Sequence, residues 1–384
     1  MTTTLESTST AVLDAVRALA PTIADRAAEI ESARRLPLDL VESLTAAGCF
    51  RLLLPASHGG AGVELPEAMR VYEALARIDG SVGWTVMIGG GGWCDLAGLP
   101  RATFDALYAG GPDVIVAGVF APTGSAVAVD GGYRVTGRWA FASGCQHSQW
   151  LYGNCMEHVG DDHRMRVALF SPDEVEIEDT WHVSGLRGTG SHHFRVDDVF
   201  VPTERTFLVM EDEPCLDVPI VRIPPPALYA LQIASVAVGI AQGALDDIVA
   251  LARDKVPLLA STALAANPLF QYQLALADTQ LRAARTLLHA EATAAWATAV
   301  DRAPFQNEQR AHIRSTVAWA ASQAVAVVDA AYHAGGSHAL YVTSPLQRRL
   351  RDIHAVTQHF LVKPDALTTA GAVLAGQDVE LGIF

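Results

Sequence analysis

The feature that most constrains this chain is the order in which its residue patterns change along the sequence. Helical spacing of apolar residues up to about residue 115 gives way to short β-branched runs, and an Ala-rich helical pattern returns from about residue 224. We therefore expect an α+β fold. Its three domains would be an N-terminal α-helical domain over 1–115, a β-barrel or β-sandwich domain over 116–220 and a C-terminal four-helix bundle over 221–384.

The bundle is predicted from four long segments joined by connections that contain Pro or Gly. These segments are Ala227–Asp254, Phe270–Val300, Asn307–Ala334 and Pro345–Phe360. In the middle region, Asp130-Gly131-Gly132 is typical of a hairpin turn, which favours an antiparallel sheet. The expected strands are 114–119, 126–129, 133–137, 150–155, 166–170 and 194–201.

Composition limits the partners of this chain. Half of the residues are hydrophobic and only 18% are charged, so we expect a large core and a homo-oligomer. The net charge of −15 argues against binding to nucleic acid or to an anionic membrane. The apolar run Ile233–Ala241 is too short to span a bilayer. Five cysteines without a CxxC pair and no signal-peptide pattern predict a cytoplasmic protein.

Two glycine-rich segments lack the context of a nucleotide site. The run Gly89–Gly92 has no following Lys and Ser or Thr, so it predicts close packing or a flexible segment beside a pocket, not a phosphate loop. Gly185, Gly188 and Gly190 do not open a βαβ unit, so we expect no NAD(P)H site. The spacing of His354 and His359 is not that of a helical metal site, and we expect no metal.

Several motifs, in this order, resemble the acyl-CoA dehydrogenase family and imply its fold of a helical domain, a β domain and a helical bundle. The segment Gly137–Gly144 looks like the strand that approaches the flavin. Gly185–Ser191 with Val196–Pro202 looks like the strand–loop–strand before the bundle. The loop and helix start within the bundle are resembled by His333–Ser337 with Pro345–Arg348 and Arg351–Asp352.

The chain departs from that family at its catalytic base. When Arg351-Asp352 is set on the family's Arg-Asp, the glutamate position falls on Phe360, and the alternative base position falls on Tyr229. Neither side chain is a carboxylate base at neutral pH. The sequence of these motifs is most similar to that of the reduced-flavin-dependent, two-component monooxygenases. The segments that carry this likeness are Ala74–Trp84, Phe141–Cys145, Gly188–Ser191, and Arg351–His354 with His359.

This resemblance implies the oxygenase component of a two-component system. Reduced flavin (FMNH2 or FADH2) and O2 would form a C4a-hydroperoxyflavin that oxygenates an aromatic or heteroaromatic small molecule, or a heteroatom. A separate NAD(P)H:flavin reductase would supply the flavin, and the chain would form a homotetramer whose bundles pack together. Two alternatives stay open: an FAD-dependent acyl-CoA-dehydrogenase-like enzyme with a displaced base, and a non-catalytic flavin-binding or scaffold homologue.

Two residues are the catalytic candidates. The resemblance places His359 beside the flavin and substrate, where an imidazole can accept a proton from a phenol or hydrogen-bond an intermediate. It places Ser143 against flavin N5. The alternatives are a histidine satisfied within the core and an ordinary turn serine.

The remaining candidates would bind the cofactor or line a substrate pocket. The alternatives for them are core packing for the aromatic residues, a solvated helix charge for the arginine and an ordinary helix–helix turn for the glycine-rich segment. Expected cofactor contacts, besides Ser143, are Trp139, Phe141, Trp181, Arg253, Gly335, Gly336 and Ser337. Expected substrate contacts are Trp84, Trp93, Phe120, His359 and Phe360.

Overall fold

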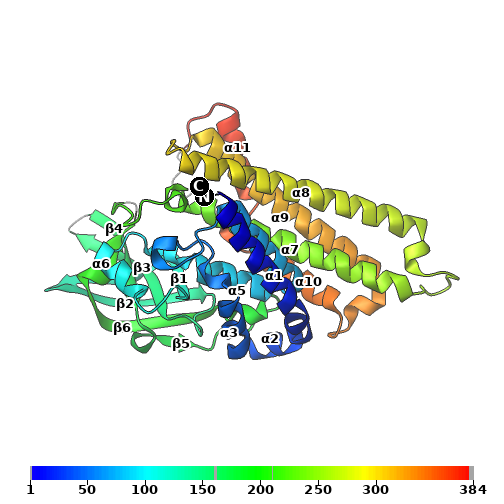
Figure 1. The fold of residues 1–384 in the computed structure, drawn as a ribbon, viewed down its shortest axis with the longest axis horizontal. Coiled ribbons are helices and arrows are strands. Elements are labelled where there is room, and N and C mark those ends of the chain that lie inside the picture. Colours follow the sequence, from blue (N-terminus) through cyan, green and yellow to red (C-terminus); the bar gives the residue numbers. More distant parts are fainter. Residues whose placement is uncertain (1, 160–161, 210, 380–384) are drawn as a thin grey trace.

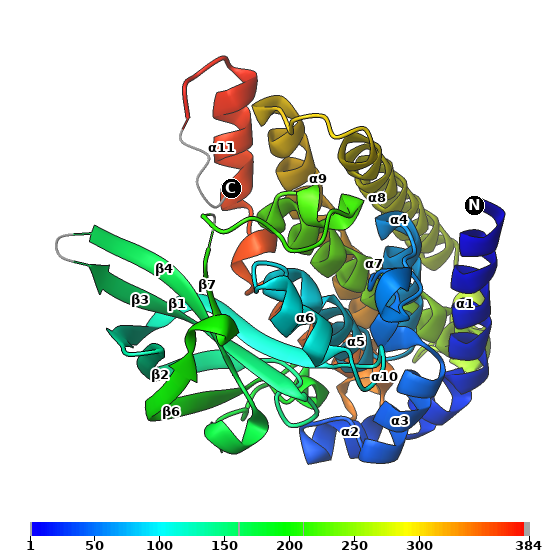
Figure 2. The same cartoon turned by 60° about the vertical axis from the view of Figure 1, so that its left-hand side comes forward.

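The structure, a computed structural model, describes residues 2–159, 162–209 and 211–379. A β-sheet region lies beside a larger helical region whose long helices extend away from the sheet (Figure 1). Turning the molecule shows the helices α5 (Gly80–Gly91) and α6 (Arg101–Leu107) between the sheet and the long helices (Figure 2). This arrangement brings three separate parts of the sequence together at one junction.

Six α-helices precede the first strand in the described part of the chain. They are α1 (Thr2–Asp25), α2 (Ala27–Ala33), α3 (Leu38–Ala46), α4 (Leu65–Ile78), α5 (Gly80–Gly91) and α6 (Arg101–Leu107). The start of α5 is fixed by Asp79, whose carboxylate accepts the backbone N–H groups of Ser81 at 2.9 Å and Val82 at 3.2 Å.

The glycine run belongs to the end of α5 and to the 3-10 turn η3 (Gly92–Leu96). A Cβ atom at Gly90 would lie 3.0 Å from the carbonyl oxygen of Phe50, and one at Gly92 would lie 2.9 Å from Val116. The absence of side chains therefore lets this helix approach neighbouring backbone closely. The prediction of close packing is confirmed, and the segment is helical rather than a loop.

A seven-stranded sheet follows, in the strand order β5-β6-β2-β1-β3-β4-β7. The predicted turn joins β1 to β2 as an antiparallel hairpin in which Val129 pairs with Gly132. The strands are β1 (Val116–Val129), β2 (Gly132–Ala142), β3 (Trp150–Val159), β4 (Asp162–Phe170), β5 (Glu176–Glu178), β6 (His192–Pro202) and β7 (Thr206–Leu208).

Two details of the predicted sheet are wrong. The strands expected at 114–119 and 126–129 form one long strand, β1, with an irregularity between Val119 and Gly124. The sheet is also not wholly antiparallel, because β3 pairs with β1 in parallel. After the hairpin, the chain crosses to the free edge of β1 and runs in the same direction as β1, which gives a mixed sheet.

The four predicted bundle helices are present, and a fifth helix follows them. They are α7 (Pro225–Asp254), α8 (Pro268–Val300), α9 (Asn307–Gly335), α10 (Pro345–Val356) and α11 (Asp365–Leu374). The last predicted helix ends at Val356 instead of Phe360. The chain turns there, with the N–H of His359 donating to the Val356 carbonyl, and enters the 3-10 turn η10 (Phe360–Val362).

The helices before and after the sheet share one hydrophobic core, which includes Met69 on α4 and Ile240 on α7. The sheet has a smaller core of its own around Trp139 and Phe194. In the described part of the chain, α7 is long and apolar enough to cross a membrane, but 89% of its most apolar window is buried inside the protein. Its hydrophobicity is therefore explained by its place at the centre of this core.

Candidate active site

Trp84, Ser143 and His359 meet at the junction of α5, the end of β2 and the segment after α10. The indole Nε1–H of Trp84 donates to Ser143 Oγ at 3.0 Å. The Trp84 ring also lies edge-on to the His359 ring, with the ring centroids 5.8 Å apart. One tryptophan therefore links the two residues that the sequence picked out for catalysis.

His359 lies beyond the end of α10, so its direction is set by a turn and not by helix geometry. Its ring stacks on Phe360 with centroids 5.1 Å apart, and its Nδ1 accepts the backbone N–H of Leu361 at 3.3 Å. Burial lowers the pKa of His359 to about 4, and the nearby positive charge of Arg314 adds to this shift. The ring is thus neutral at pH 7, with its proton on Nε2.

This arrangement favours one of the two chemistries expected for His359. An imidazole whose Nδ1 already accepts a hydrogen bond presents an N–H donor at Nε2. It can donate a hydrogen bond from Nε2 to an oxygen atom. A second proton would have to bind at Nδ1, where it would break the hydrogen bond from the Leu361 N–H. His354 lies on the exposed side of α10, where its Nε2 is 3.1 Å from Asp329 Oδ1 on α9.

Phe141 and Trp181 form an aromatic corner next to Ser143. Phe141 is 68% exposed and has a positive φ of 69°, an unusual conformation for a residue of this size. Its ring lies edge-on to Trp181, with centroids 6.2 Å apart and an interplanar angle of 87°. Trp181 is held by a bond from its Nε1–H to the Leu186 carbonyl at 3.1 Å.

The corner has the chemistry that a flavin ring requires. A large exposed aromatic side chain offers an apolar face to a flat ring, and the neighbouring Ser143 oxygen offers hydrogen bonding to the ring's edge. Backbone strain at an exposed aromatic residue is typical of a ligand site. The residues present therefore fit the cofactor that the resemblance implies.

The structure places Trp139 and Trp93 in the core. Trp139 is completely buried in the sheet, stacks on Phe194 at 4.9 Å and donates its Nε1–H to the Asn154 carbonyl. The register of β2 shifts between Trp139 and Ala142, and Trp139 therefore lies in the core of the sheet, as in the alternative of core packing, while Phe141 is exposed. Trp93 is 2% exposed and packs edge-on against Phe104, as in the alternative of core packing.

Phe120 and Phe360 keep partly exposed rings. Phe120, on β1, is 36% exposed, and Phe360, beside His359, is 46% exposed. Both therefore remain candidates for a substrate pocket.

Four of the expected cofactor residues lie at the other end of α10 from His359. Gly335, Gly336 and Ser337 precede this helix, whose 12 residues span about 18 Å. Gly336 has a positive φ of 53°, and Lys255 Nζ donates to the Gly335 carbonyl at 2.5 Å. Arg253 is exposed at the end of α7. Within one chain, these residues and Ser143 do not form one site.

Sequence reasoning missed a polar cluster between η3, β3 and α7. The Tyr152 hydroxyl donates to Asp95 Oδ2 at 2.7 Å, and Tyr229 lies close enough to affect the same carboxyl. Burial raises the pKa of Asp95 to about 6, while the two tyrosines oppose this rise. Only Tyr229 carried any sequence signal, because it occupies the family's alternative base position.

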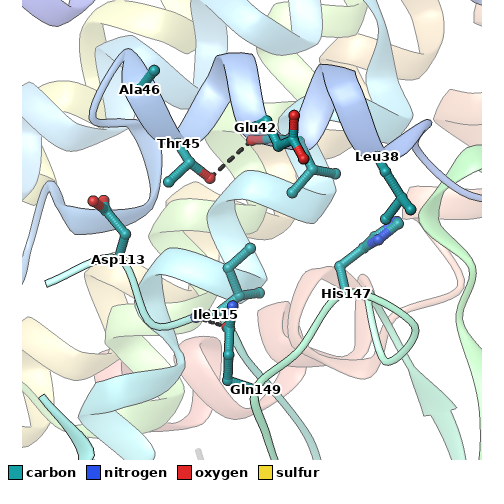
Figure 3. A pocket seen from close by; sticks show the side chains of 9 residues that line it. Leu38, Glu42, Thr45, Ala46, Asp113, Ile115, His147 and Gln149 are labelled. Atoms are coloured by element: carbon teal, nitrogen blue, oxygen red, sulfur yellow. Dashed lines mark hydrogen bonds between the residues drawn. The ribbon is translucent and has the colours of Figure 1, made fainter. Parts of the chain in front are cut away.

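A pocket lies elsewhere, between α3 and the segments that precede β1 and β3 (Figure 3). Its volume is about 480 Å³, and it is lined by Leu38, Val41, Glu42, Thr45, Ala46, Asp113, Ile115, His147 and Gln149. None of the residues predicted from the sequence lines it. Among the described residues, no three His, Cys, Asp or Glu side chains are placed to hold a metal ion.

Comparison with known proteins agrees with the fold and the departure from dehydrogenase chemistry. Two family models match: the acyl-CoA dehydrogenase N-terminal domain over residues 6–97 and the acyl-CoA dehydrogenase C-terminal domain over residues 231–364. The chain is 32% identical to an indole-3-acetate monooxygenase of Pseudomonas putida over 96% of its own length and 93% of that protein.

Two further comparisons point the same way. The chain is 32% identical to the oxygenase subunit HsaA, a flavin-dependent monooxygenase of Rhodococcus jostii, over 91% of its length and 94% of that protein. The solved structure of XiaF from a Streptomyces species, in complex with FADH2 and glycerol, superposes with a TM-score of 0.92 at 27% identity, and the match covers 97% of both chains. This chain belongs to the flavin-dependent monooxygenases of the acyl-CoA dehydrogenase fold.

Membership of this family confirms the predicted fold and enzyme class. The chain is an oxidoreductase of the monooxygenase type. Phe360, which the resemblance sets on the glutamate position, is 46% exposed rather than core. The readings as a dehydrogenase with a displaced base and as a non-catalytic scaffold gain no support from these relatives.

Proposed function

We propose that this monooxygenase is the oxygenase component of a two-component system that hydroxylates a small aromatic or heteroaromatic molecule, or oxidises a heteroatom in one. The observation that carries this proposal is the convergence of Trp84, Ser143 and His359 at a site without the dehydrogenase carboxylate. Reduced flavin, as FMNH2 or FADH2, would supply the activation of O2 when bound. It would lie against Phe141 and Trp181, with its N5 edge towards Ser143.

In this proposal each side chain has a separate task. Phe141 and Trp181 exclude water from one face of the cofactor. Ser143, positioned by the Trp84 indole, holds the N5 edge. His359 donates its Nε2–H to an oxygen of the reacting groups, and the exposed rings of Phe120 and Phe360 bound the space for an aromatic substrate.

A separate NAD(P)H:flavin reductase is proposed as the source of the reduced flavin. HsaA is named an oxygenase subunit, which supports the presence of a second component. The glycine pattern Gly185–Gly190 forms a strained turn around η5 (Arg187–Thr189) and not a dinucleotide-binding βαβ unit. We propose a cytoplasmic location for the pair.

A homotetramer is proposed from the exposed apolar ends of the bundle. Leu258 is 93% exposed, Leu259 is 99% exposed and Val342 is 86% exposed, which is costly for an isolated chain. The turn Gly335–Ser337 lies in the same connection as Val342. Association there would also bring Arg253 and this turn against another copy. Light scattering coupled to gel filtration would test it, and a monomer would contradict it.

The function is tested by an anaerobic titration of the purified protein with reduced FMN and reduced FAD. Saturable binding of one or both is expected, with weaker binding of the oxidised forms. Adding oxygen and a panel of phenols and indoles should then give a product that carries one added oxygen atom, detected by mass spectrometry with ¹⁸O2. Failure to bind any flavin would contradict the proposal, as would bleaching of bound oxidised FAD by an acyl-CoA.

A further inference from the structure

Three hydroxyl side chains lie in a continuous line that begins at Ser143. Ser143 Oγ is 2.7 Å from Ser191 Oγ, and Ser191 Oγ is 2.7 Å from Thr189 Oγ1. Thr189 Oγ1 then donates to the Leu186 carbonyl oxygen at 2.8 Å. All three side chains are at least nine-tenths buried, so water does not compete for these bonds.

The direction of every hydrogen bond in this line can be deduced by counting protons. A carbonyl oxygen only accepts, so the single hydroxyl proton of Thr189 points to Leu186. Ser191 must then donate its proton to Thr189, and Ser143 must donate its proton to Ser191. The Trp84 indole can only donate, so Ser143 accepts from it.

The end of the line is held firmly. Leu186 has a positive φ of 52°, and its backbone N–H donates to Asp352 Oδ1 on α10 at 2.6 Å. Its carbonyl accepts from Trp181 as well as from Thr189. The carbonyl therefore cannot turn away to let the hydroxyl protons reverse. A second tie joins the two loops, since the Gly144 N–H donates to the Thr189 carbonyl at 2.9 Å.

We infer that the Thr189–Ser191 pair leaves Ser143 able to accept a hydrogen bond from a bound flavin but unable to donate one. The pair thereby selects the reduced cofactor over the oxidised one. This inference rests on the proposed function. The Ser143 proton is committed to Ser191, and one lone pair is committed to Trp84, which leaves one lone pair for the ligand. N5 of a reduced flavin carries a hydrogen and can donate to that lone pair. N5 of an oxidised flavin carries only a lone pair, which would face the lone pair of Ser143 Oγ without a hydrogen bond.

Binding of oxidised flavin would require the whole line to break or reverse. The loss of one net hydrogen bond corresponds to about a tenfold change in affinity. Such a difference would allow the enzyme to release spent flavin and to rebind the reduced form from its reductase. Thr189 and Ser191 are positioning residues in this scheme, because they act on the flavin through Ser143.

The test is a Thr189→Val variant, which keeps the side-chain shape and removes the proton that fixes the line. Dissociation constants for reduced flavin (anaerobic) and oxidised flavin are measured by fluorescence or calorimetry on the same protein. We expect affinity for the reduced form to change by less than about twofold and affinity for the oxidised form to rise by about five- to tenfold. Ser191→Ala, which frees the Ser143 proton directly, should give the same result.

Ser148→Ala is the matched control. Ser148 is a buried serine in the same loop that donates to the Cys145 carbonyl at 2.9 Å and takes no part in the line. It should leave the ratio of the two affinities unchanged. If both folded variants keep the wild-type ratio, the inference is wrong while the proposed function stands. If the wild-type protein binds neither flavin, the proposed function and the inference both fail.

Discussion

His359 is held as a neutral hydrogen-bond donor by its immediate surroundings. The Leu361 N–H occupies Nδ1, and burial with the neighbouring Arg314 keeps the pKa of the ring near 4. Those two effects act in the same direction, since a second proton would have to sit on Nδ1 and would displace the Leu361 bond. The residue is therefore suited to steadying an oxygen atom without exchanging a proton with it.

Replacing His359 by Ala should lower the rate of product formation by about a hundredfold, because a positioned donor to the reacting oxygen is lost. Affinity for reduced flavin should change little, since Phe141 and Ser143 remain. Single-turnover product yield and anaerobic flavin binding are the measurements. His354→Ala, on the exposed side of α10, is the control and should behave as wild type. Wild-type turnover in His359→Ala would remove the residue from the chemistry.

The helix α5 brings Trp84 to the site, and its glycines set how closely it packs. Gly83 stands directly beside Trp84, and a Cβ atom there would lie 2.7 Å from Ala76 on α4. The two helices are thus in contact through backbone, and any added carbon must push them apart. The position of the Trp84 indole on Ser143 depends on that contact.

Gly83→Ala should therefore destabilise the protein by about 1–3 kcal/mol, even though alanine has the higher helix propensity. Gly371→Ala is the matched comparison, because this glycine lies in α11 with no atom within 4 Å of the added carbon. It should stabilise by about 0.5–1 kcal/mol or leave stability unchanged. Urea unfolding of both variants measures this, and equal effects of the two substitutions would show that the α4–α5 contact is not limiting.

Some of the helices and strands could be predicted from the sequence, and others could not. The bundle helices follow from long Ala-rich patterns, and the hairpin at Asp130–Gly132 follows from its turn residues. The end of α10 at Val356 was not predicted, because no Gly or Pro marks it and the turn is held by backbone bonds that depend on tertiary packing. The parallel β1–β3 pair was missed for a similar reason, since strand order is set by the crossing of the chain and not by local pattern.

In the candidate site, too, residues in sequence motifs could be predicted, whereas contacts that depend on tertiary packing could not. The resemblance led to Ser143 and His359 because they stand in motifs. It also led to Trp139, which would share a face with Phe141 in a regular strand, but the register of β2 shifts between Trp139 and Ala142 and Trp139 lies in the core. Thr189 and Ser191 entered the sequence analysis only within the motif Gly188–Ser191, with no role of their own. The contact between Ser191 and Ser143 spans 48 residues and exists only once β2 and β6 lie side by side.

Three distant parts of the chain are joined at a buried acidic cluster. Asp352 on α10 accepts from Leu186 in the sheet region, and Asp79 beside it caps α5. The two carboxyls are 2% and 1% exposed, and Arg348 is the nearest cation, 3.7 Å from Asp79. Burial and the charge of Asp79 raise the pKa of Asp352 to about 7, so the protein retains a proton there that the unfolded chain loses.

The sign of the resulting pH dependence follows from proton binding. An unfolded aspartate has a pKa near 3.9, so between about pH 4 and pH 7 the folded state binds more protons than the unfolded state. The contribution of Asp352 to the unfolding free energy therefore falls as the pH rises through this range. Asp95, whose pKa is raised to about 6, adds to the same trend.

Asp352→Asn should remove the contribution of Asp352 to this pH dependence, because an amide does not titrate. The amide oxygen can still accept the hydrogen bond from the Leu186 N–H. Between pH 5 and pH 7.5 the unfolding free energy of the wild type should fall by about 2–3 kcal/mol relative to that of the variant. Urea unfolding at several pH values measures the difference. Asp130→Asn, in the exposed hairpin turn, should keep the wild-type profile. Parallel profiles for wild type and Asp352→Asn would mean that Asp352 is ionised in the folded protein and that Arg348 offsets its burial.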